Sequence, residues 1–265
     1  MTASLPARSP NPVDKALVRA AFSRGAAAYD ARAGVQRRVR DRVLRLVADA
    51  TPGARRVLDV GAGTGALLAR LGADRRTGVD LAPGMCAAAR AACPAAGIAV
   101  ADAEALPFAS GAFDLFVSTS TFQWLPRLEP ALAEARRVLA PGGTLVLALF
   151  GERTLHELRG AWRAAGGGNR THRFQALDEL ERALASAGLA PHALEEEDVV
   201  ERHPDARAVL RSLKAIGATN AAPGSRGLGG RRETLEMLRQ YDARHAAPEG
   251  VPATYHVLYA VADRR

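Results

Sequence analysis

One short segment constrains the fold of this chain more than any other: residues 57–65, which read Val-Leu-Asp-Val-Gly-Ala-Gly-Thr-Gly. An apolar run ends in an aspartate and passes into three alternating glycines, and a helical pattern follows over residues 66–71. Glycine lets the backbone turn sharply and lets a ligand approach without a Cβ in the way. A glycine turn between a strand and a helix is typical of a nucleotide-type site at the carboxyl edge of a parallel sheet.

Apolar segments of strand length recur along the chain, and most are separated by helical patterns. We expect strands at residues 56–60, 76–81, 98–101, 113–118, 144–150, 193–201 and 254–262. We expect helices at residues 13–22, 35–50, 83–92, 129–139, 154–164, 177–187, 205–216 and 232–244. The first five strands are apolar on both faces, which predicts a parallel sheet covered on both sides.

The chain shows no internal repeat and no linker that would divide it. We expect a disordered tail at residues 1–12 and a single domain over residues 13–265. Within that domain we expect N-terminal helices at 13–50, a cofactor-binding core at 56–150 and a helical insertion at 205–245.

The composition indicates which partners and which cellular compartment suit the protein. The chain carries 36 Lys and Arg against 28 Asp and Glu, a formal net charge of +8. This excess indicates either an anionic partner or a genome-wide bias toward arginine, since Lys15 and Lys214 are the only lysines. Cys86 and Cys93 lack metal-ligand spacing, so we expect a reducing compartment and no metal. The longest clean apolar run, residues 145–150, is too short to span a bilayer, and we expect a cytoplasmic protein.

Three aspartates lie at or just after the ends of the expected strands, around the glycine turn. Because Gly61-x-Gly63-x-x-Ala66 also satisfies the permissive dinucleotide fingerprint, the glycines alone do not identify the ligand. Asp59 precedes the turn, where a carboxylate can hold an ammonium group, and Asp80 is placed for ribose hydroxyls. Asp102 suits the exocyclic amine of adenine. Three carboxylates would repel a pyrophosphate but suit a cationic, phosphate-free nucleoside such as S-adenosylmethionine.

These motifs resemble those of the class I S-adenosylmethionine-dependent methyltransferases. The matching segments are residues 57–65, Gly78-Val-Asp-Leu81, Met85, Asp102-Ala-Glu104, Leu106-Pro-Phe108, Phe113-Asp114 and Arg137-Val-Leu-Ala-Pro-Gly-Gly143. The resemblance implies a Rossmann-like α/β fold: a mostly parallel seven-stranded sheet with helices on both faces, an N-terminal helical cap and a helical insertion before the last strand.

The same resemblance assigns cofactor-binding roles. It implies that Gly61, Gly63 and Gly65 bring the backbone close to the methionine part of S-adenosylmethionine. Asp80 would bind ribose, Leu81 and Met85 would flank adenine, and Asp102 with Ala103 would cap the adenine edge.

Five flanking runs narrow the family. They are Phe22-Ser-Arg-Gly-Ala-Ala-Ala-Tyr-Asp30, Thr121-Phe-Gln-Trp-Leu125, Thr154-Leu-His-Glu-Leu158, Arg211-Ser-Leu-Lys-Ala-Ile-Gly-Ala-Thr-Asn220 and Thr254-Tyr-His-Val-Leu-Tyr259. In this order they resemble the malonyl-acyl-carrier-protein O-methyltransferases of biotin synthesis over nearly the whole chain. The resemblance implies methylation of the free malonyl carboxylate, which loses its charge and can then enter fatty-acid elongation as a primer.

This chemistry sets what the catalytic residues must do. A malonyl carboxylate is already ionised at neutral pH, so its methylation needs no general base. An arginine suits the carboxylate through bidentate hydrogen bonds, and the candidates are Arg211, Arg170 and Arg173. We expect Tyr29 and Trp124 to wall the transfer site, with Gln123 as a possible hydrogen-bond donor.

Residues 205–232 contain one acid, Asp205, among many basic side chains. Acyl carrier proteins are strongly acidic, so this segment is a candidate docking surface acting by electrostatic steering; the alternative is a solvated basic face. Its docking residues would be Arg207, Lys214, Arg226, Arg231 and Arg232. We expect a monomer with no nucleic-acid or membrane partner. Two other functions stay open: a small-molecule carboxyl or O-methyltransferase, and a respiratory-complex assembly factor of the same fold.

Overall fold

The computed structural model describes residues 13–166, 173–215 and 230–265. The tail expected at residues 1–12 lies outside these ranges, as do Arg170 and Arg226.

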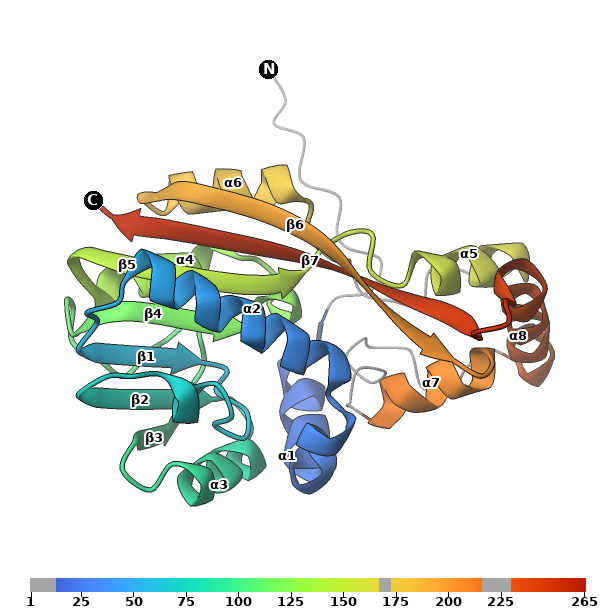
Figure 1. Cartoon of the computed structure of the whole chain (residues 1–265), viewed down its shortest axis with the longest axis horizontal. Coiled ribbons are helices and arrows are strands. Elements are labelled where there is room, and N and C mark those ends of the chain that lie inside the picture. Colours follow the sequence, from blue (N-terminus) through green and yellow to red (C-terminus); the bar gives the residue numbers. More distant parts are fainter. Residues whose placement is uncertain (1–12, 167–172, 216–229) are drawn as a thin grey trace.

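Seven strands of the described chain form one sheet in the order β3-β2-β1-β4-β5-β7-β6 (Figure 1). They are β1 (Arg56–Val60), β2 (Arg75–Asp80), β3 (Gly97–Val100), β4 (Phe113–Thr119), β5 (Leu139–Phe150), β6 (Leu189–His203) and β7 (Val251–Arg264). The first five strands are parallel, and β7 is antiparallel to both β5 and β6. The prediction of a mostly parallel, seven-stranded sheet is confirmed.

Helices cover both faces of this sheet (Figure 1). The helices of the described residues are α1 (Lys15–Arg32), α2 (Gly34–Ala50), α3 (Pro83–Ala92), α4 (Glu129–Val138), α5 (His156–Ala164), α6 (Leu177–Ser186), α7 (Ala206–Ala215) and α8 (Arg231–His245), with 3-10 turns η1 (Leu68–Arg70) and η2 (Phe122–Trp124). Successive residues of a strand point to opposite faces. Val57 therefore packs in the core beneath α2, whereas Leu58 packs in the core beneath α4 and α6.

Two local predictions are wrong. Residues 23–33 were expected to be a connection, but α1 continues to Arg32. The run Gly25-Ala-Ala-Ala-Tyr29 has no apolar period, yet alanine has the highest helix propensity and sustains the helix without one. Residues 66–71 were expected to be helical, but residues 66–67 form turns and only Leu68–Arg70 form the short helix η1. Leu71, one residue before Gly72, is already extended. Strand β5 begins at Leu139, earlier than the strand expected at residues 144–150, and it includes Gly142 with a φ of +73°.

The long strands β6 and β7 extend past the parallel strands and carry α5, α7 and α8 at their far end (Figure 1). Tyr241 of α8 is fully buried there and donates a hydrogen bond to the carbonyl of Pro252, 2.6 Å away. The predicted helical insertion before the last strand is thus present as α7 and α8. None of the helices in the described residues is both long and apolar enough to cross a membrane.

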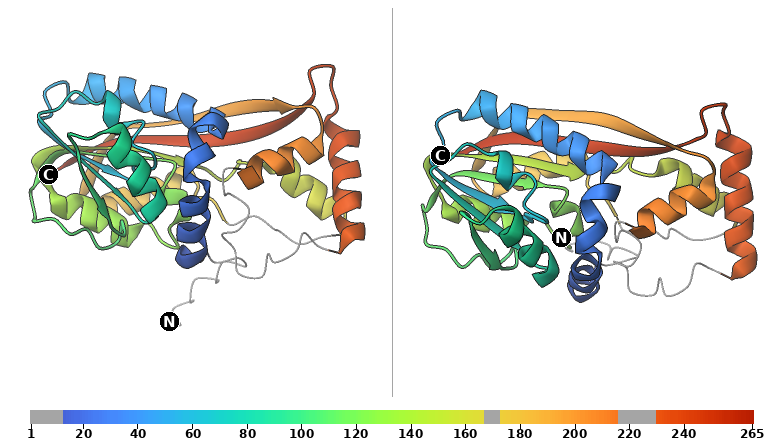
Figure 2. Two further views of the ribbon diagram at one scale, coloured as in Figure 1. Left: turned by 90° about the horizontal axis from the view of Figure 1, so that it is seen from below. Right: turned by 60° about the horizontal axis from the view of Figure 1, so that its bottom comes forward.

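The N-terminal helix α1 stands beside the carboxyl ends of β1 and β2 (Figure 2). It packs on the first turn of α3, where a Cβ on Gly84 would lie 2.8 Å from the Cα of Ser23. This close backbone contact brings α1 over the edge of the sheet at which the parallel strands end.

Candidate active site

A pocket with an empty volume of about 720 Å³ lies at the carboxyl ends of the parallel strands, beneath α1. The lining residues come from α1, the glycine turn, the ends of β2 and β4, and the segment after β3. They are Lys15, Val18, Phe22, Tyr29, Val60, Gly61, Gly63, Asp80, Leu81, Met85, Ala101, Asp102, Ala103, Thr119, Ser120, Thr121, Trp124 and Leu125.

The glycine turn forms one wall of the pocket. Gly61 has a φ of +76°, and a Cβ placed on it would lie 2.6 Å from the Cβ of Thr121. Gly63 has a φ of +55° and nothing within 4 Å of an added Cβ, because it faces open space. Gly65 is not a lining residue, and it packs instead against Ala89 of α3. The turn therefore leaves room for a ligand at Gly63 and makes close backbone packing possible at Gly61.

Asp80 connects the glycine turn to the start of α3. Its Oδ2 accepts a hydrogen bond from the Gly63 amide at 3.0 Å, and its Oδ1 accepts one from the Ala82 amide at 2.8 Å. Burial raises the pKa of this carboxyl, and these two N–H donors partly offset the effect. A carboxylate oxygen can accept more than one hydrogen bond. Asp80 thus keeps the capacity to accept ribose hydroxyls.

Asp59 lies at the end of β1 and is 1% exposed. Both of its carboxylate oxygens are buried without a hydrogen-bond partner among the described residues. Burial raises its pKa to about 8, and the nearby charge of Asp80 adds to the shift. Asp59 does not belong to the lining set, so its expected contact with an ammonium group stays a prediction.

Asp102 is held by a lysine that sequence reasoning did not assign to the site. The Lys15 Nζ lies 2.8 and 2.7 Å from the two carboxylate oxygens of Asp102 and also donates to Glu104. Burial opposes the charged form of Lys15, but its hydrogen bonds to Asp102 and Glu104 raise its pKa overall. The only sequence signal was rarity: Lys15 is one of two lysines in an arginine-rich chain.

Three aromatic rings meet at the pocket. The Phe22 ring lies edge-on to Tyr29 and to Trp124, with ring centroids 6.1 and 5.7 Å apart. Burial raises the pKa of the Tyr29 phenol above its usual range, and the charges of Asp80 and Asp30 raise it further. Tyr29 therefore stays neutral at physiological pH. Tyr29 and Trp124 both line this pocket, and their expected place at the methyl-transfer site stays a prediction.

Three expected substrate-binding side chains are not among the residues that line this pocket. The Arg211 side chain on α7 is 70% exposed and lies 3.9 Å from Asp205. Arg173 is exposed and pairs with Glu179. Gln123 is buried at 3% exposure, and its Nε2 donates to the Ser120 carbonyl. Sequence spacing fixed the element on which each residue lies but not the direction of its side chain.

Comparison with known proteins identifies the family. A methyltransferase-domain family model matches residues 58–147. Over 95% of this chain and 100% of the relative, the sequence is 52% identical to a malonyl-[acyl-carrier protein] O-methyltransferase of Geobacter sulfurreducens. The chain belongs to this family. A second member, from Halorhodospira halophila, is 39% identical over 93% of this chain and 87% of its own length.

A bifunctional biotin-biosynthesis protein of Cellvibrio japonicus also matches, at 37% identity over 94% of this chain and 50% of that protein. Among solved structures, a putative methyltransferase from Bacillus halodurans superposes with a TM-score of 0.62 over 84% of this chain and 98% of its own, at 16% identity. That structural likeness supports the fold of this O-methyltransferase family member.

The pocket fits the S-adenosylmethionine that a class I methyltransferase requires. Gly63 faces open space, Asp80 has free acceptor capacity, and Leu81 and Met85 supply apolar walls. The aromatic side chains of Phe22, Tyr29 and Trp124 line the pocket, and aromatic rings suit a positively charged sulfur. The buried carboxyl of Asp59, which has no hydrogen-bond partner among the described residues, lies beneath the turn.

Proposed function

We propose that this protein transfers a methyl group from S-adenosylmethionine to the free carboxylate of a malonyl group on acyl carrier protein, giving the methyl ester that primes pimeloyl synthesis for biotin. The observation that carries the proposal is the end-to-end similarity to relatives named for malonyl-[acyl-carrier protein] methylation. This similarity extends over 95% and 93% of this chain, well beyond the cofactor-binding core expected at residues 56–150.

The chain's own residues act by placement and by exclusion of water. When bound, S-adenosylmethionine supplies an electrophilic methyl group on a cationic sulfur. Phe22, Tyr29 and Trp124 wall the pocket and keep water from the reacting carboxylate, which strengthens it as a nucleophile. The neutral Tyr29 phenol adds no charge that would compete with the acceptor. Orientation of the two reactants supplies most of the remaining acceleration.

A transfer assay with labelled S-adenosylmethionine tests the proposed function. We expect methyl ester on malonyl-acyl carrier protein, with kcat/KM at least roughly a hundredfold above that for malonyl-coenzyme A or free malonate, because protein docking adds binding energy. Equal kcat/KM for free small acids would instead identify a small-molecule carboxyl methyltransferase.

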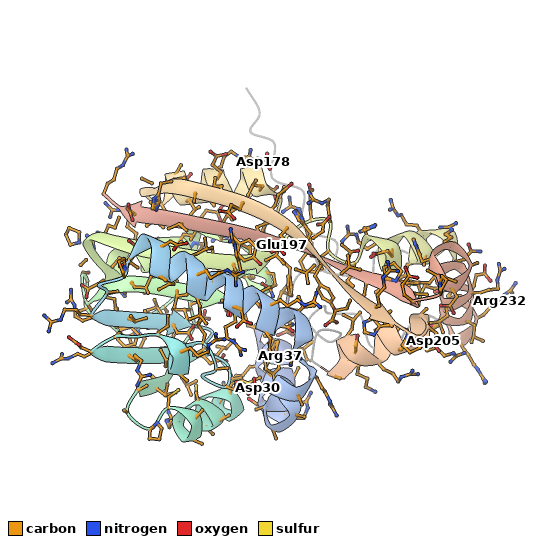
Figure 3. All side chains as sticks on the ribbon, viewed as in Figure 1. Asp30, Arg37, Asp178, Glu197, Asp205 and Arg232 are labelled. Atoms are coloured by element: carbon orange, nitrogen blue, oxygen red, sulfur yellow. The ribbon has the colours of Figure 1, made fainter. Side chains whose placement is uncertain are left out.

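The exposed basic side chains of α7 and α8 supply the surface for this partner. Arg207, Arg211 and Lys214 are exposed and recur at the spacing of one helix face. Arg231 and Arg232 begin α8, and Arg232 points outward at that end of the molecule (Figure 3). We therefore assign Arg211 to carrier docking together with its neighbours on α7, in place of the carboxylate-binding role expected for it.

Reversing three of these charges tests the docking surface. The R207E/K214E/R231E variant is expected to raise the KM for malonyl-acyl carrier protein by about tenfold or more at low salt. Each substitution replaces attraction between a basic side chain and the acidic carrier protein with repulsion. The affinity for S-adenosylhomocysteine should not change. The matched control R38E/R45E/R75E reverses three exposed arginines elsewhere and should leave the carrier KM near that of the wild type. Equal effects of the two triple variants would contradict a localised docking surface.

A further inference from the structure

The backbone is strained where β4 enters the active site. Ser120 follows the last residue of β4 and has a φ of +54°. Only Ser120 and Leu155 among the described non-glycine residues have a positive φ. A residue with a Cβ pays for this conformation in free energy and keeps it only where its surroundings enforce it. Ser120 also lines the pocket, so the strain lies at the functional site.

Two hydrogen bonds hold Ser120 in place. Its amide donates to the carbonyl of Ala148 on β5, at 2.8 Å. Its carbonyl accepts from the Gln123 Nε2, also at 2.8 Å. Gln123 belongs to η2 and is not a lining residue. Its side-chain amide therefore contacts the turn on the side away from the pocket and is not placed to touch a ligand.

The shape of this turn decides what meets the glycine loop. Thr121 comes directly after Ser120 and lies against Gly61, at the position where a Cβ on that glycine would collide with it. The Thr121 hydroxyl donates back to the Thr119 carbonyl at 3.1 Å. The turn also leads into Trp124, which packs edge-on against Phe22 of α1. If Ser120 relaxed to a negative φ, the contact of Thr121 with Gly61 and the place of Trp124 would both change.

We propose that Gln123 is a positioning residue: its side-chain amide holds Ser120 in the left-handed conformation and thereby fixes the β4 turn against the glycine loop. The sequence motif Thr121-Phe-Gln-Trp-Leu125 then has a structural explanation. Gln123 acts on the cofactor pocket through Ser120 and Thr121 and not as a donor to substrate. The inference rests on the proposed function only for the identity of the cofactor.

The decisive variant removes the donor but keeps the side-chain length. Q123M is expected to weaken binding of S-adenosylhomocysteine by roughly five- to tenfold, the loss expected for one buried hydrogen bond. Glycine adopts a positive φ without a Cβ penalty. Q123M/S120G should therefore bind within about twofold to threefold of S120G alone, because the turn no longer needs to be held.

The matched control is Q123M/S120A, which loses the same serine hydroxyl but keeps a Cβ at the strained position. It should bind as weakly as Q123M. Calorimetry measures these affinities. Trp124 fluorescence, recorded in a W162F background, reports the conformation of the β4 turn in the absence of any methyl acceptor. Wild-type affinity in Q123M, or equal behaviour of the glycine and alanine double variants, would overturn the proposal.

A second variant keeps the test valid should Q123M not fold. In Q123E a protonated side chain can donate to Ser120, whereas an ionised one cannot. Relative to the wild type, its affinity for S-adenosylhomocysteine should fall as the pH rises from 5 to 8, and a constant ratio would contradict the inference. Because the readout is cofactor binding, a failed transfer assay with malonyl-acyl carrier protein would leave this result unaffected.

Discussion

Replacing Gly61 with alanine is expected to lower the affinity for S-adenosylhomocysteine by at least roughly a hundredfold, through two costs that add. The residue has a φ of +76°, which an alanine adopts only with strain. The added methyl group would also lie 2.6 Å from the Cβ of Thr121, so the glycine loop or the β4 turn must move. Either movement changes the wall of the pocket. Isothermal calorimetry of the purified G61A variant measures the loss directly.

Gly142 provides the matched control for G61A. It has a φ of +73°, almost the same as Gly61, but an added Cβ meets nothing within 4 Å. It lies near the amino end of β5, away from the carboxyl edge where the pocket is. G142A should therefore lower the free energy of unfolding by about 1–2 kcal/mol and leave cofactor affinity unchanged. Near-wild-type binding by G61A would show that the close packing against Thr121 does not shape the site.

The residues on the cofactor side of this site could be predicted from the sequence, because the topology of a parallel sheet brings them together. Gly61 and Gly63 follow β1 and Asp80 ends β2, and the carboxyl ends of parallel strands meet at one edge of the sheet. Their positions along the chain therefore fixed their positions in space. Leu81 and Met85 come to the same edge for the same reason, since α3 begins directly after β2.

Other features of the site depend on tertiary contacts that no local pattern encodes. Lys15 meets Asp102 across 87 residues, and only the packing of α1 on α3 brings them together. The exposed direction of Arg211 follows from which side of α7 packs inward, where Val209 and Leu213 are buried. The role of Gln123 depends on a single backbone angle at Ser120, and a sequence does not display φ.

Replacing Asp59 with asparagine is expected to stabilise the free protein at alkaline pH and to weaken its cofactor binding. An unfolded aspartate has a pKa near 3.9, whereas burial raises that of folded Asp59 to about 8. Between these values the folded chain holds a proton that the unfolded chain has lost. The free energy of unfolding of the wild type therefore falls as the pH rises from about 4 to about 8.

Asparagine carries no charge to bury, so D59N should lose this part of the pH dependence and exceed the wild type in stability by on the order of 2–4 kcal/mol at pH 9. Urea unfolding across the pH range measures the difference. D114N is the control of opposite sign, because hydrogen bonds from Arg56 lower the pKa of Asp114. Its removal should cost stability above pH 4, and parallel pH profiles for the two variants would contradict the assignment to Asp59.

The same proton links Asp59 to ligand binding. A cationic ammonium group near Asp59 would favour the ionised carboxylate, so binding at pH 7 should release a proton to the buffer. The calorimetric heat of S-adenosylhomocysteine binding should then differ between buffers of low and high ionisation enthalpy in the wild type but not in D59N. D59N should also bind about tenfold more weakly, since its neutral amide supplies no opposite charge. A buffer-independent heat in the wild type would show that the buried carboxyl keeps its proton and serves the fold alone.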